Sequence, residues 1–557
     1  MFLPTDEQLN TLDRQALVII VSALKDQIES MQKQLDAYQT SLADNNRQIE
    51  LLTEQLRLMN QRQFGRKSET AQIDGQLSFF NAFNEAEASL SPDAPEPEIT
   101  EVIVSSFKRS KTKGQRDIDL DGLPARIFEH KLSAEELADK FPDGYKELPV
   151  EIHKRLYIVP ETFLVDEHHV HVYASRKNDG TIIRANRPVD LFRNSIATAA
   201  LVASIMNGKY ANAMPLERLS KAYKSNGIKL ETNTLANWVI RSAERYLSLL
   251  YDRLHQEIYD NHVIHADESP VKVMRPDGGK MKNGKKTYMW VYRNTPSSLK
   301  PVVLFEWQSS RRTDHPREFL KGFTGTLVTD GYQVYHKLGK EREDLNVAGC
   351  WVHARRKFAE IIKSIGSKES KGSIADKAYA MITEIMHCDN EFDDLPAQDR
   401  LSQRQLILTE KVDAYFAWIK QKYAEVGKQS NIGRALAYSI HQEKYLRTFL
   451  NDGLVSMDNN YAEQAIRPFT IGRKNFVMIE SANGAKASAI IYSLVETAKA
   501  NGLNTYQYLE LLLTEIPQHM EDTSLDFIDK LLPWSEYVQK ACPSKYKKSK
   551  SSTIRTF

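Results

Sequence analysis

The order of apolar segments between residues 262 and 353 restricts the fold of this chain more than any other feature. Five runs have the length and the apolar content of β-strands. Turns rich in glycine or proline separate the first three, whereas helix-like segments precede the last two. The five runs are residues 263–273, 287–292, 302–307, 325–329 and 347–352. Strands joined first by tight turns and then by helices predict a mixed sheet with helices on its faces.

This order matches a ribonuclease-H-like fold, in which the first and the fourth strand lie side by side. Asp267 lies in the first predicted strand, and Asp330 directly follows the fourth. Adjacent strands would bring these two carboxylates together although they are far apart in the sequence. A third carboxylate, Glu463, lies near the start of a predicted helix and is followed by several Arg and Lys residues.

Three carboxylates in this arrangement suit divalent metal ions that act on phosphodiesters. Mg²⁺ prefers carboxylate oxygens and keeps water or phosphate in its remaining positions. Two such ions about 4 Å apart can activate an attacking oxygen and stabilise the leaving oxygen on the other side of the phosphorus. Clustered carboxylates repel one another without metal, so the charges of both must be considered together.

Each carboxylate also has a structural interpretation. Asp267 and Asp330 could be turn residues that end strands, since Asp-Gly is itself a turn signature. Glu463 stands three residues after Asn460 and could be the partner of a helix cap. Glu268 could replace Asp267 as a ligand, although in a strand it would point to the opposite face.

Composition sets wide bounds on the rest of the chain. With 557 residues, two to four domains are expected. The net charge of +2 gives no argument for a nucleic-acid partner, which must come from local clusters. The three cysteines are far apart and form no CxxC pair, which argues against a disulfide framework or a cysteine-based zinc site. The apolar run 16–24 is too short for a membrane span and lacks the basic region of a signal peptide, so we expect a cytoplasmic protein.

A seven-residue repeat of apolar side chains fills the first sixty residues. One row is Val21, Ile28, Leu35, Leu42, Ile49 and Leu56, and the second is Leu17, Leu24, Met31, Tyr38, Leu52 and Met59. The repeat predicts a coiled coil over residues 1–62, through which the chain would self-associate. A single amphipathic helix packed on its own domain is the alternative. Residues 63–119 then form a polar linker, and 120–190 a small β-rich module.

Residues 191–260 predict a helical region with the shape of a helix-turn-helix. Pro215 suits the first turn of a helix that ends before Gly227, and Thr232 or Asn233 would cap a long second helix. Helical hairpins of this kind also occur in structural bundles, so DNA reading is one of two interpretations. The residues that would share a DNA-facing side of the second helix are Thr234, Asn237 and Arg241.

Two further clusters of basic side chains suit contacts with a DNA backbone. They are Arg355, Arg356 and Lys357 in one segment, and Arg467, Arg473 and Lys474 in the other. His353 precedes the first cluster, directly after a predicted strand. It could orient a phosphate or could equally be a packed histidine.

Taken together, these segments resemble the transposases of the insertion sequence 66 family, in the DDE superfamily. The resemblance implies that Asp267, Asp330 and Glu463 form a catalytic triad that binds Mg²⁺ or Mn²⁺, with two ions. It also implies a ribonuclease-H-like core that a helical insertion interrupts. The segments that carry the resemblance are residues 64–69, 265–270, 329–332, 349–358, 458–475 and 492–502.

Two departures from the family pattern limit what the resemblance implies. Members commonly have a cysteine zinc-binding module before the helix-turn-helix region, but residues 120–190 contain no cysteine. No zinc is therefore expected there. Gln464 stands where the family usually has Arg, so one phosphate contact would be weaker.

The sequence thus predicts an α+β, multidomain DNA transposase that binds terminal inverted repeats, cleaves DNA and transfers strands. Its expected partners are element ends, target DNA, further copies of itself and helper proteins, in the cytoplasm near the nucleoid and away from membranes. A non-catalytic DNA-binding derivative and a stand-alone ribonuclease-H-like nuclease are the alternatives. The expected catalytic core has two parts, and the last region is a helix with a basic tail. The remaining boundaries are 261–358 and 453–515 for the core, 359–452 for the insertion and 516–557 for the C-terminal region.

Overall fold

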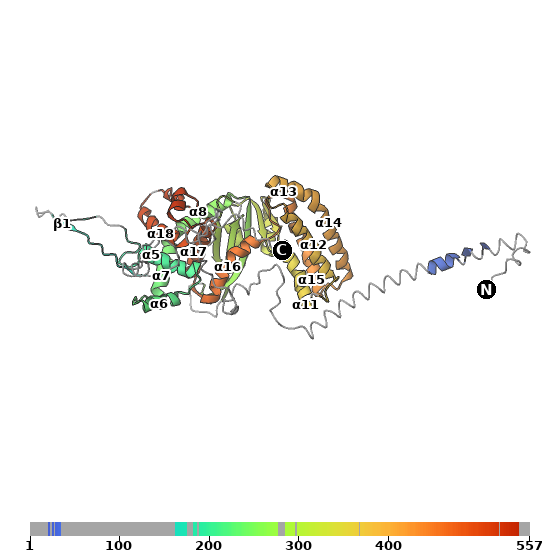
Figure 1. Cartoon of the computed structure of the whole chain (residues 1–557), viewed down its shortest axis with the longest axis horizontal. Helices are drawn as coiled ribbons and strands as arrows, with labels where there is room; N and C mark the ends of the chain where they lie inside the picture. The colour runs from blue at the N-terminus through green and yellow to red at the C-terminus, as the bar shows by residue number, and fades with distance from the viewer. Residues whose placement is uncertain are drawn as a thin grey trace, which may run out of the picture. The chain divides into compact units, whose positions relative to one another are not determined.

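A six-stranded mixed sheet forms the centre of this chain in its computed structural model (Figure 1). Its strands follow the order β5-β4-β3-β6-β7, and β8 pairs with the far end of β3. β3, β4 and β5 are antiparallel neighbours, whereas β6 runs parallel to β3 and β7. The bounds are β3 (Val263–Arg275), β4 (Lys285–Asn294), β5 (Val303–Gln308), β6 (Gly325–Thr329), β7 (Leu345–Gly349) and β8 (Ile479–Ser481). The predicted mixed sheet, with its first and fourth strands adjacent, is confirmed.

The structure describes most of the chain after residue 189 and short segments before it. Two units can be distinguished, Pro188–Arg555 with Met1–Ala71, and Gln72–Arg187 with the last two residues. The second unit contains an antiparallel pair, β1 (Val172–Ala174) and β2 (Ile182–Arg184). The described residues are 21–22, 25–26, 28–34, 162–174, 182–185, 189–276, 285–295, 298–366, 368–522 and 524–544.

The burial of side chains along β3 depends on which strands lie beside each part of it. From Val263 to Ala266 every residue is buried, because this half lies between β4 and β6. Beyond Ser269 buried and exposed positions alternate, as expected of a strand with one covered face. The strand β6 is buried from Thr326 to Thr329, in keeping with its position between two parallel neighbours.

Helix α17 (Ala482–Ala500) covers the edge strand β5. The hydroxyl of Thr497 accepts a hydrogen bond from Val303 N at 3.0 Å and donates one to Val303 O at 2.9 Å. Ser493 Oγ accepts from Phe305 N at 2.7 Å. Side chains of one helix thus satisfy backbone groups that an edge strand would otherwise leave open to another chain.

The helical region before the sheet contains α5 to α8, and α6 and α7 flank a turn at Gly227. The cap of α7 is Glu231, whose carbonyl accepts from Leu235 N at 3.2 Å, so the predicted cap at Thr232 or Asn233 is wrong by one or two residues. The elements are α5 (Ala199–Met206), η3 (Asn207–Ala211), α6 (Leu216–Ser225), α7 (Thr232–Ser242), η4 (Ala243–Leu247) and α8 (Ser248–Tyr259).

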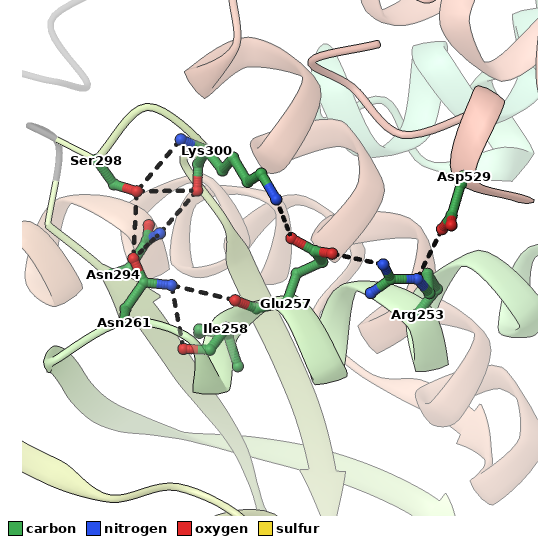
Figure 2. A network of polar contacts seen from close by, with 8 residues as sticks. All are labelled: Arg253, Glu257, Ile258, Asn261, Asn294, Ser298, Lys300 and Asp529. Atoms are coloured by element: carbon green, nitrogen blue, oxygen red, sulfur yellow. Dashed lines mark hydrogen bonds and ion pairs between the residues drawn. The ribbon is translucent and has the colours of Figure 1, made fainter.

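A polar network fastens α8 to two other parts of the chain (Figure 2). The carboxylate of Glu257 is 5 % exposed and pairs with Arg253 at 2.6 Å and with Lys300 at 2.9 Å. Arg253 also pairs with Asp529 at 2.7 Å. Lys300 lies in the β4–β5 connection and Asp529 in α19 (Phe527–Lys530), so one buried carboxylate links three segments.

Several helices connect the strands or follow them. The predicted helix 317–322 begins three residues earlier, and β8 was not predicted at all. These elements are α9 (Asp314–Phe319), α10 (Gln333–Glu341), α11 (Trp351–Ile365), α16 (Asn460–Phe476), α18 (Thr505–Glu515), η7 (Ile516–His519) and α20 (Glu536–Ala541).

The strand predicted over 347–352 ends at Gly349, and α11 begins at Trp351. Trp351 N donates to Met457 O at 2.9 Å, and its indole Nε1 donates to Leu446 O at 2.9 Å. These tertiary contacts favour a helix for an apolar run whose periodicity cannot distinguish helix from strand. His353 therefore lies in the first turn of α11 and does not directly follow a strand.

The expected insertion consists of helices that pack on one side of the sheet (Figure 1). Its core includes residues of α11 and continues to Val263, Val328 and Ala348 of the strands. The elements are α12 (Ile374–Asn390), α13 (Ala397–Gln403), η5 (Arg404–Leu408), α14 (Thr409–Glu425), α15 (Asn431–Leu446) and η6 (Thr448–Asn451).

The predicted coiled coil is described only in part. Residues 21–22, 25–26 and 28–34 are helical, and Val21, Ile28 and Met31 are exposed there. The rest of residues 1–62, the linker 63–119 and most of the module 120–190 lie outside the described residues. Within the described part of the chain, every helix is too short or too polar to cross a membrane.

Arg404 anchors the insertion, and its loss should destabilise the fold. Its guanidinium is 1 % exposed and binds both carboxylate oxygens of Asp389, at 2.6 and 2.9 Å. It also donates to the carbonyls of Phe449, Asp452 and Val455. Arg404→Ala leaves a buried charge unpaired, so we expect the free energy of unfolding to fall by about 3–5 kcal/mol.

Urea denaturation followed by circular dichroism measures this loss. The matched control is Arg434→Ala, because Arg434 is exposed on α15 and bonds only to its neighbour Asn431 among the interactions described. The control should change stability by less than about 0.5 kcal/mol. Equal losses in the two variants would contradict the anchoring role.

Candidate active site

Asp267 and Asp330 lie at matching positions of two adjacent parallel strands. The pairing of β3 with β6 ends at His265 and Val328. Asp267 stands two residues further along β3, and Asp330 stands two residues after Val328, directly after the end of β6. Continuing the register places the two aspartates at matching positions. This register supports the predicted approach of the two carboxylates, and the charge of Asp330 contributes to the raised pKa of Asp267.

Asp330 is held by its own turn and by the insertion. Its carboxylate accepts from Tyr332 N at 3.0 Å, and its carbonyl accepts from the Tyr438 hydroxyl at 3.0 Å. Gly331 follows with φ +89°, and a Cβ there would lie 2.9 Å from the Tyr438 hydroxyl oxygen. Only glycine suits this backbone and this space, so the turn and the helix α15 together fix the direction of Asp330.

Asn459 brings the start of α16 to β3. Its side-chain Nδ2 donates to Ala266 O at 2.8 Å, and its Oδ1 accepts from His265 Nδ1 at 3.2 Å. Its backbone N–H donates to Cys350 Sγ at 3.3 Å. The first turn of α16 is therefore attached one residue before Asp267, and that turn carries Glu463. Sequence reasoning quoted Asn459 in the motif but gave it no role.

The pKa of Asp267 shows that the carboxylates interact. It is raised well above its usual range, first by burial and then by the charges of Glu268, Asp330 and Glu463. The N–H of Glu268, which donates to Asp267 Oδ1 at 2.9 Å, acts in the opposite direction. A buried carboxylate that faces three others is costly to ionise, and divalent cations would offset that cost.

The carboxylate of Glu463 lies close to His353 and Arg356. Its Oε1 has no hydrogen-bond partner among the described residues, although it is buried. The ring nitrogen His353 Nδ1 lies 3.7 Å from Oε1, and the guanidinium nitrogen Arg356 Nη2 lies 3.5 Å from Oε2. The interpretation of Glu463 as the partner of a cap is wrong, because the N–H of Asn460 donates to Asp458 Oδ1 at 3.0 Å.

Glu268 is held by a different set of partners from the three carboxylates. Arg311 Nε donates to its Oε1 at 2.9 Å, and the Tyr335 hydroxyl donates to its Oε2 at 3.2 Å. Burial raises the pKa of Glu268 to about 7, with a further rise from Asp330 and an opposing effect of Arg311. The guanidinium of Arg311 also lies 3.6 Å from the Tyr332 ring centre. No local signal in the sequence pairs Arg311 with Glu268.

Cys350 lies between Asp330 and Glu463 in the sequence, directly before α11. Burial raises the pKa of its thiol to about 12, while the N–H groups of His353 and Asn459 lower it. Its sulfur, a ring nitrogen of His353 and a carboxylate oxygen of Glu463 all lie within 4.8 Å of one another. The sequence alone assigns this cysteine no role in a site.

The predicted DNA-contacting residues of the core have varied surroundings. Arg355 lies over the Tyr379 ring and Lys357 over the Tyr438 ring. Arg356 contacts Glu463, and Arg473 donates to Ser269 Oγ at 3.0 Å and to Pro270 O. Arg467 is partly buried and Lys474 is exposed, both on α16. Contact with DNA stays a prediction for all six.

On α7, Asn237 and Arg241 are exposed and Thr234 is partly so. Four- and three-residue spacing places them on neighbouring turns of one helix face. The guanidinium of Arg241 lies 4.5 Å from the ring centre of Phe192. This face is accessible, and its contact with DNA is likewise a prediction.

Comparison with known protein families shows to which family this chain belongs. The family described as "Transposase IS66 family" matches residues 194–487, which hold the sheet, the insertion and all three carboxylates. The "IS66 C-terminal element" matches residues 493–534. A third description, "Transposase C of IS166 homeodomain", matches residues 51–126, which lie outside the described part of the structure and overlap the predicted linker. The class is thus that of transposases, and the chain belongs to the IS66 family.

Three relatives come from Sinorhizobium fredii (strain NBRC 101917 / NGR234). The uncharacterized protein y4qI is 29% identical over 544 residues, which cover 92% of this chain and 97% of y4qI. The uncharacterized protein y4jD is 29% identical, with 65% of this chain and 71% of y4jD covered. The uncharacterized protein y4hP is 27% identical, with 60% and 61% covered. The similarity to y4qI therefore extends over nearly the whole of both chains.

A test of the charge cluster follows from the raised pKa of Asp267. Its folded-state pKa exceeds the unfolded value, so its ionisation disfavours folding above the folded pKa, and this penalty disappears as the pH falls. Asp267→Asn removes the charge. In EDTA at pH 8 we expect the free energy of unfolding to rise by about 0.5–2 kcal/mol.

Denaturation at pH 8 and at pH 5 measures the effect, which should be smaller at pH 5. Asp314→Asn is the matched control, since Asp314 lies on the surface in α9 with its side chain 72 % exposed. A loss of stability in Asp267→Asn would show instead that the carboxylate stabilises β3, through the hydrogen bond that it accepts from Glu268 N.

Proposed function

We propose that this protein is a DNA transposase of the DDE type, which cleaves DNA at the ends of its element and transfers the freed strands to target DNA. The observation that carries the proposal is that the charges of Asp330, directly after β6, and Glu463, in the first turn of α16, act on Asp267 of β3 in a member of the IS66 family. These carboxylates are the proposed catalytic residues.

The donor set fits divalent cations. All three ligands are carboxylates, and the pKa of Asp267 is raised first by burial and then by the charges of its neighbours. Hard oxygen ligands favour Mg²⁺ or Mn²⁺. Asp267, Asp330 and Glu463 would hold two such ions, which when bound supply an activated attacking oxygen and a stabilised leaving oxygen.

The protein's own groups fix the geometry of this chemistry. Asp267 and Asp330 project from paired strands, which limits their movement relative to each other. Asn459 fixes the third carboxylate through the backbone of β3. Arg356, 3.5 Å from Glu463 Oε2 and 38 % exposed, is suited to bind a phosphate beside the carboxylates. Such positioning is what two successive in-line displacements at phosphorus require, first by water and then by a 3′-hydroxyl.

DNA recognition and assembly use other surfaces in this proposal. The exposed side of α7 would contact terminal repeats, and the basic residues of α11 and α16 would contact the DNA backbone. The exposed Val21, Ile28 and Met31 support self-association through the predicted coiled coil, since a parallel partner would bury them. Two copies would then bring two element ends together. The proposed location is the nucleoid.

The main chemical prediction concerns Glu463. Glu463→Gln keeps the shape of the side chain but removes one charge from the proposed metal site. Because the ions supply several kcal/mol of transition-state stabilisation, we expect cleavage and strand transfer to fall at least about 100-fold. The assay uses purified protein, Mg²⁺ and labelled DNA that carries the element ends, with products separated by electrophoresis.

The matched control is Glu360→Gln, an exposed glutamate on α11, which should retain activity. Binding without cleavage by the unaltered protein would favour a non-catalytic DNA-binding derivative. Cleavage without end preference or joining would favour a stand-alone nuclease. Full activity of Glu463→Gln would contradict the triad itself.

Arg241 provides a test of the proposed DNA face. Arg241→Gln removes one cation from the exposed side of α7, so binding to end DNA should weaken. The slope of log K against log salt should fall by about 1. Fluorescence anisotropy over a salt series measures both quantities. Lys221→Gln on α6 is the control, because Lys221 pairs with Glu217 at 2.7 Å; an identical change in both variants would argue against a specific role of α7.

A further inference from the structure

Three chemically different ligand groups meet where α11 and α16 begin. Cys350 directly precedes α11, His353 lies in its first turn, and Glu463 lies in the first turn of α16. One ligand atom of each lies within 4.8 Å of the others, a span that one metal ion can bridge. These atoms are Cys350 Sγ, a ring nitrogen of His353 and a carboxylate oxygen of Glu463.

Two of these groups carry buried atoms without partners. His353 Nδ1 and Glu463 Oε1 have no hydrogen-bond partner among the described residues, and they lie 3.7 Å apart. Leaving a buried polar atom unsatisfied is unfavourable. Two ligands bound at about 2.0–2.2 Å in tetrahedral geometry are separated by roughly 3.4 Å. A small closure of the pair would therefore let a single ion satisfy both atoms.

The contact of the other ring nitrogen, His353 Nε2, is compatible with metal binding at Nδ1. Arg356 Nη1 donates to His353 Nε2 at 3.3 Å, which places the ring proton on Nδ1. When Nδ1 binds a metal, that proton moves to Nε2 and Arg356 withdraws from it. The side chain of Arg356 is 38 % exposed, so its guanidinium can turn toward solvent and leave Glu463 Oε2 to the proposed Mg²⁺ site.

The thiol decides which class of ion the site favours. Thiolate and imidazole are preferred by Zn²⁺ and Co²⁺, whereas Mg²⁺ prefers oxygen ligands. Cys350 Sγ accepts a hydrogen bond from Asn459 N, an outer contact of the kind that orients a metal-bound thiolate. One sulfur, one nitrogen and one oxygen leave a fourth position of a tetrahedral ion for water.

We propose that Cys350, His353 and Glu463 bind one zinc-class ion, separate from the Mg²⁺ proposed at Asp267, Asp330 and Glu463. Binding releases the thiol proton of Cys350 to solvent. The site goes beyond the proposed DNA chemistry and shares only Glu463 with it. It also differs from the cysteine module for which no zinc was expected, since that module lies at residues 120–190.

Cobalt titration of the metal-free, full-length protein tests the site. Adding Co²⁺ alone should produce a thiolate-to-cobalt charge-transfer band that saturates at one ion per chain, and Zn²⁺ should remove it. Excess Mg²⁺ should leave the band in place. Cys350→Ser should abolish the band, whereas Cys388→Ser and Cys542→Ser, at the other two cysteines of the chain, should retain it.

A second variant guards against misfolding, because Cys350 is buried against the start of α16. His353→Asn keeps the thiol and its hydrogen bond, and it should weaken Co²⁺ binding at least about 10-fold with an unchanged circular dichroism spectrum. No band in the unaltered protein, a band that persists in Cys350→Ser, or unchanged affinity in His353→Asn would each overturn the proposal. DNA cleavage does not enter the readout, so loss of the proposed transposase activity leaves the result intact.

Discussion

The amide of Asn459 joins two parts of the core that the insertion separates in the sequence. Through it the start of α16 is bonded to Ala266 in β3, next to Asp267. The parallel pairing of β3 with β6 already aligns Asp267 with Asp330. Together these contacts place three carboxylates from three distant segments at one edge of the sheet. Arg473 at the other end of α16 adds a second attachment to β3, through Ser269 and Pro270.

This arrangement brings several carboxylates together in a buried part of the protein, where their ionised forms are energetically unfavourable. The raised pKa values of Asp267 and Glu268 are the consequence, and Arg311 compensates only the second of them. Folded proteins accept such a cost where a site needs it, and cation binding then stabilises the folded state. The charge cluster is thus better explained by a ligand than by the stability of the sheet.

The insertion between α11 and α16 is stabilised by its own core and by one buried ion pair. The charges of Arg404 and Asp389 neutralise each other. Arg404 also donates to backbone carbonyls of the segment before Asp458, among them that of Val455. The entropic cost of closing a loop rises only slowly with its length, so a long insertion with its ends held together destabilises the core little. The same helices supply Tyr438, which fixes the backbone at Asp330. The insertion therefore contributes to the geometry of the site.

The sequence by itself determined the mixed sheet with its first and fourth strands adjacent, the position of Asp330 directly after the fourth strand, and the family. These features depend on local periodicity, turn residues and motifs, which a linear chain records directly. The sequence placed Asp267 at the end of a strand, whereas β3 continues to Arg275. It did not determine that Trp351 begins a helix, that β8 pairs with β3, or that Arg311 holds Glu268, because each depends on contacts between distant segments. The proximity of Cys350 and His353 to Glu463 was likewise decided only by the tertiary structure. Packing and hydrogen bonding across the insertion bring these groups together, and no spacing along the chain encodes that distance.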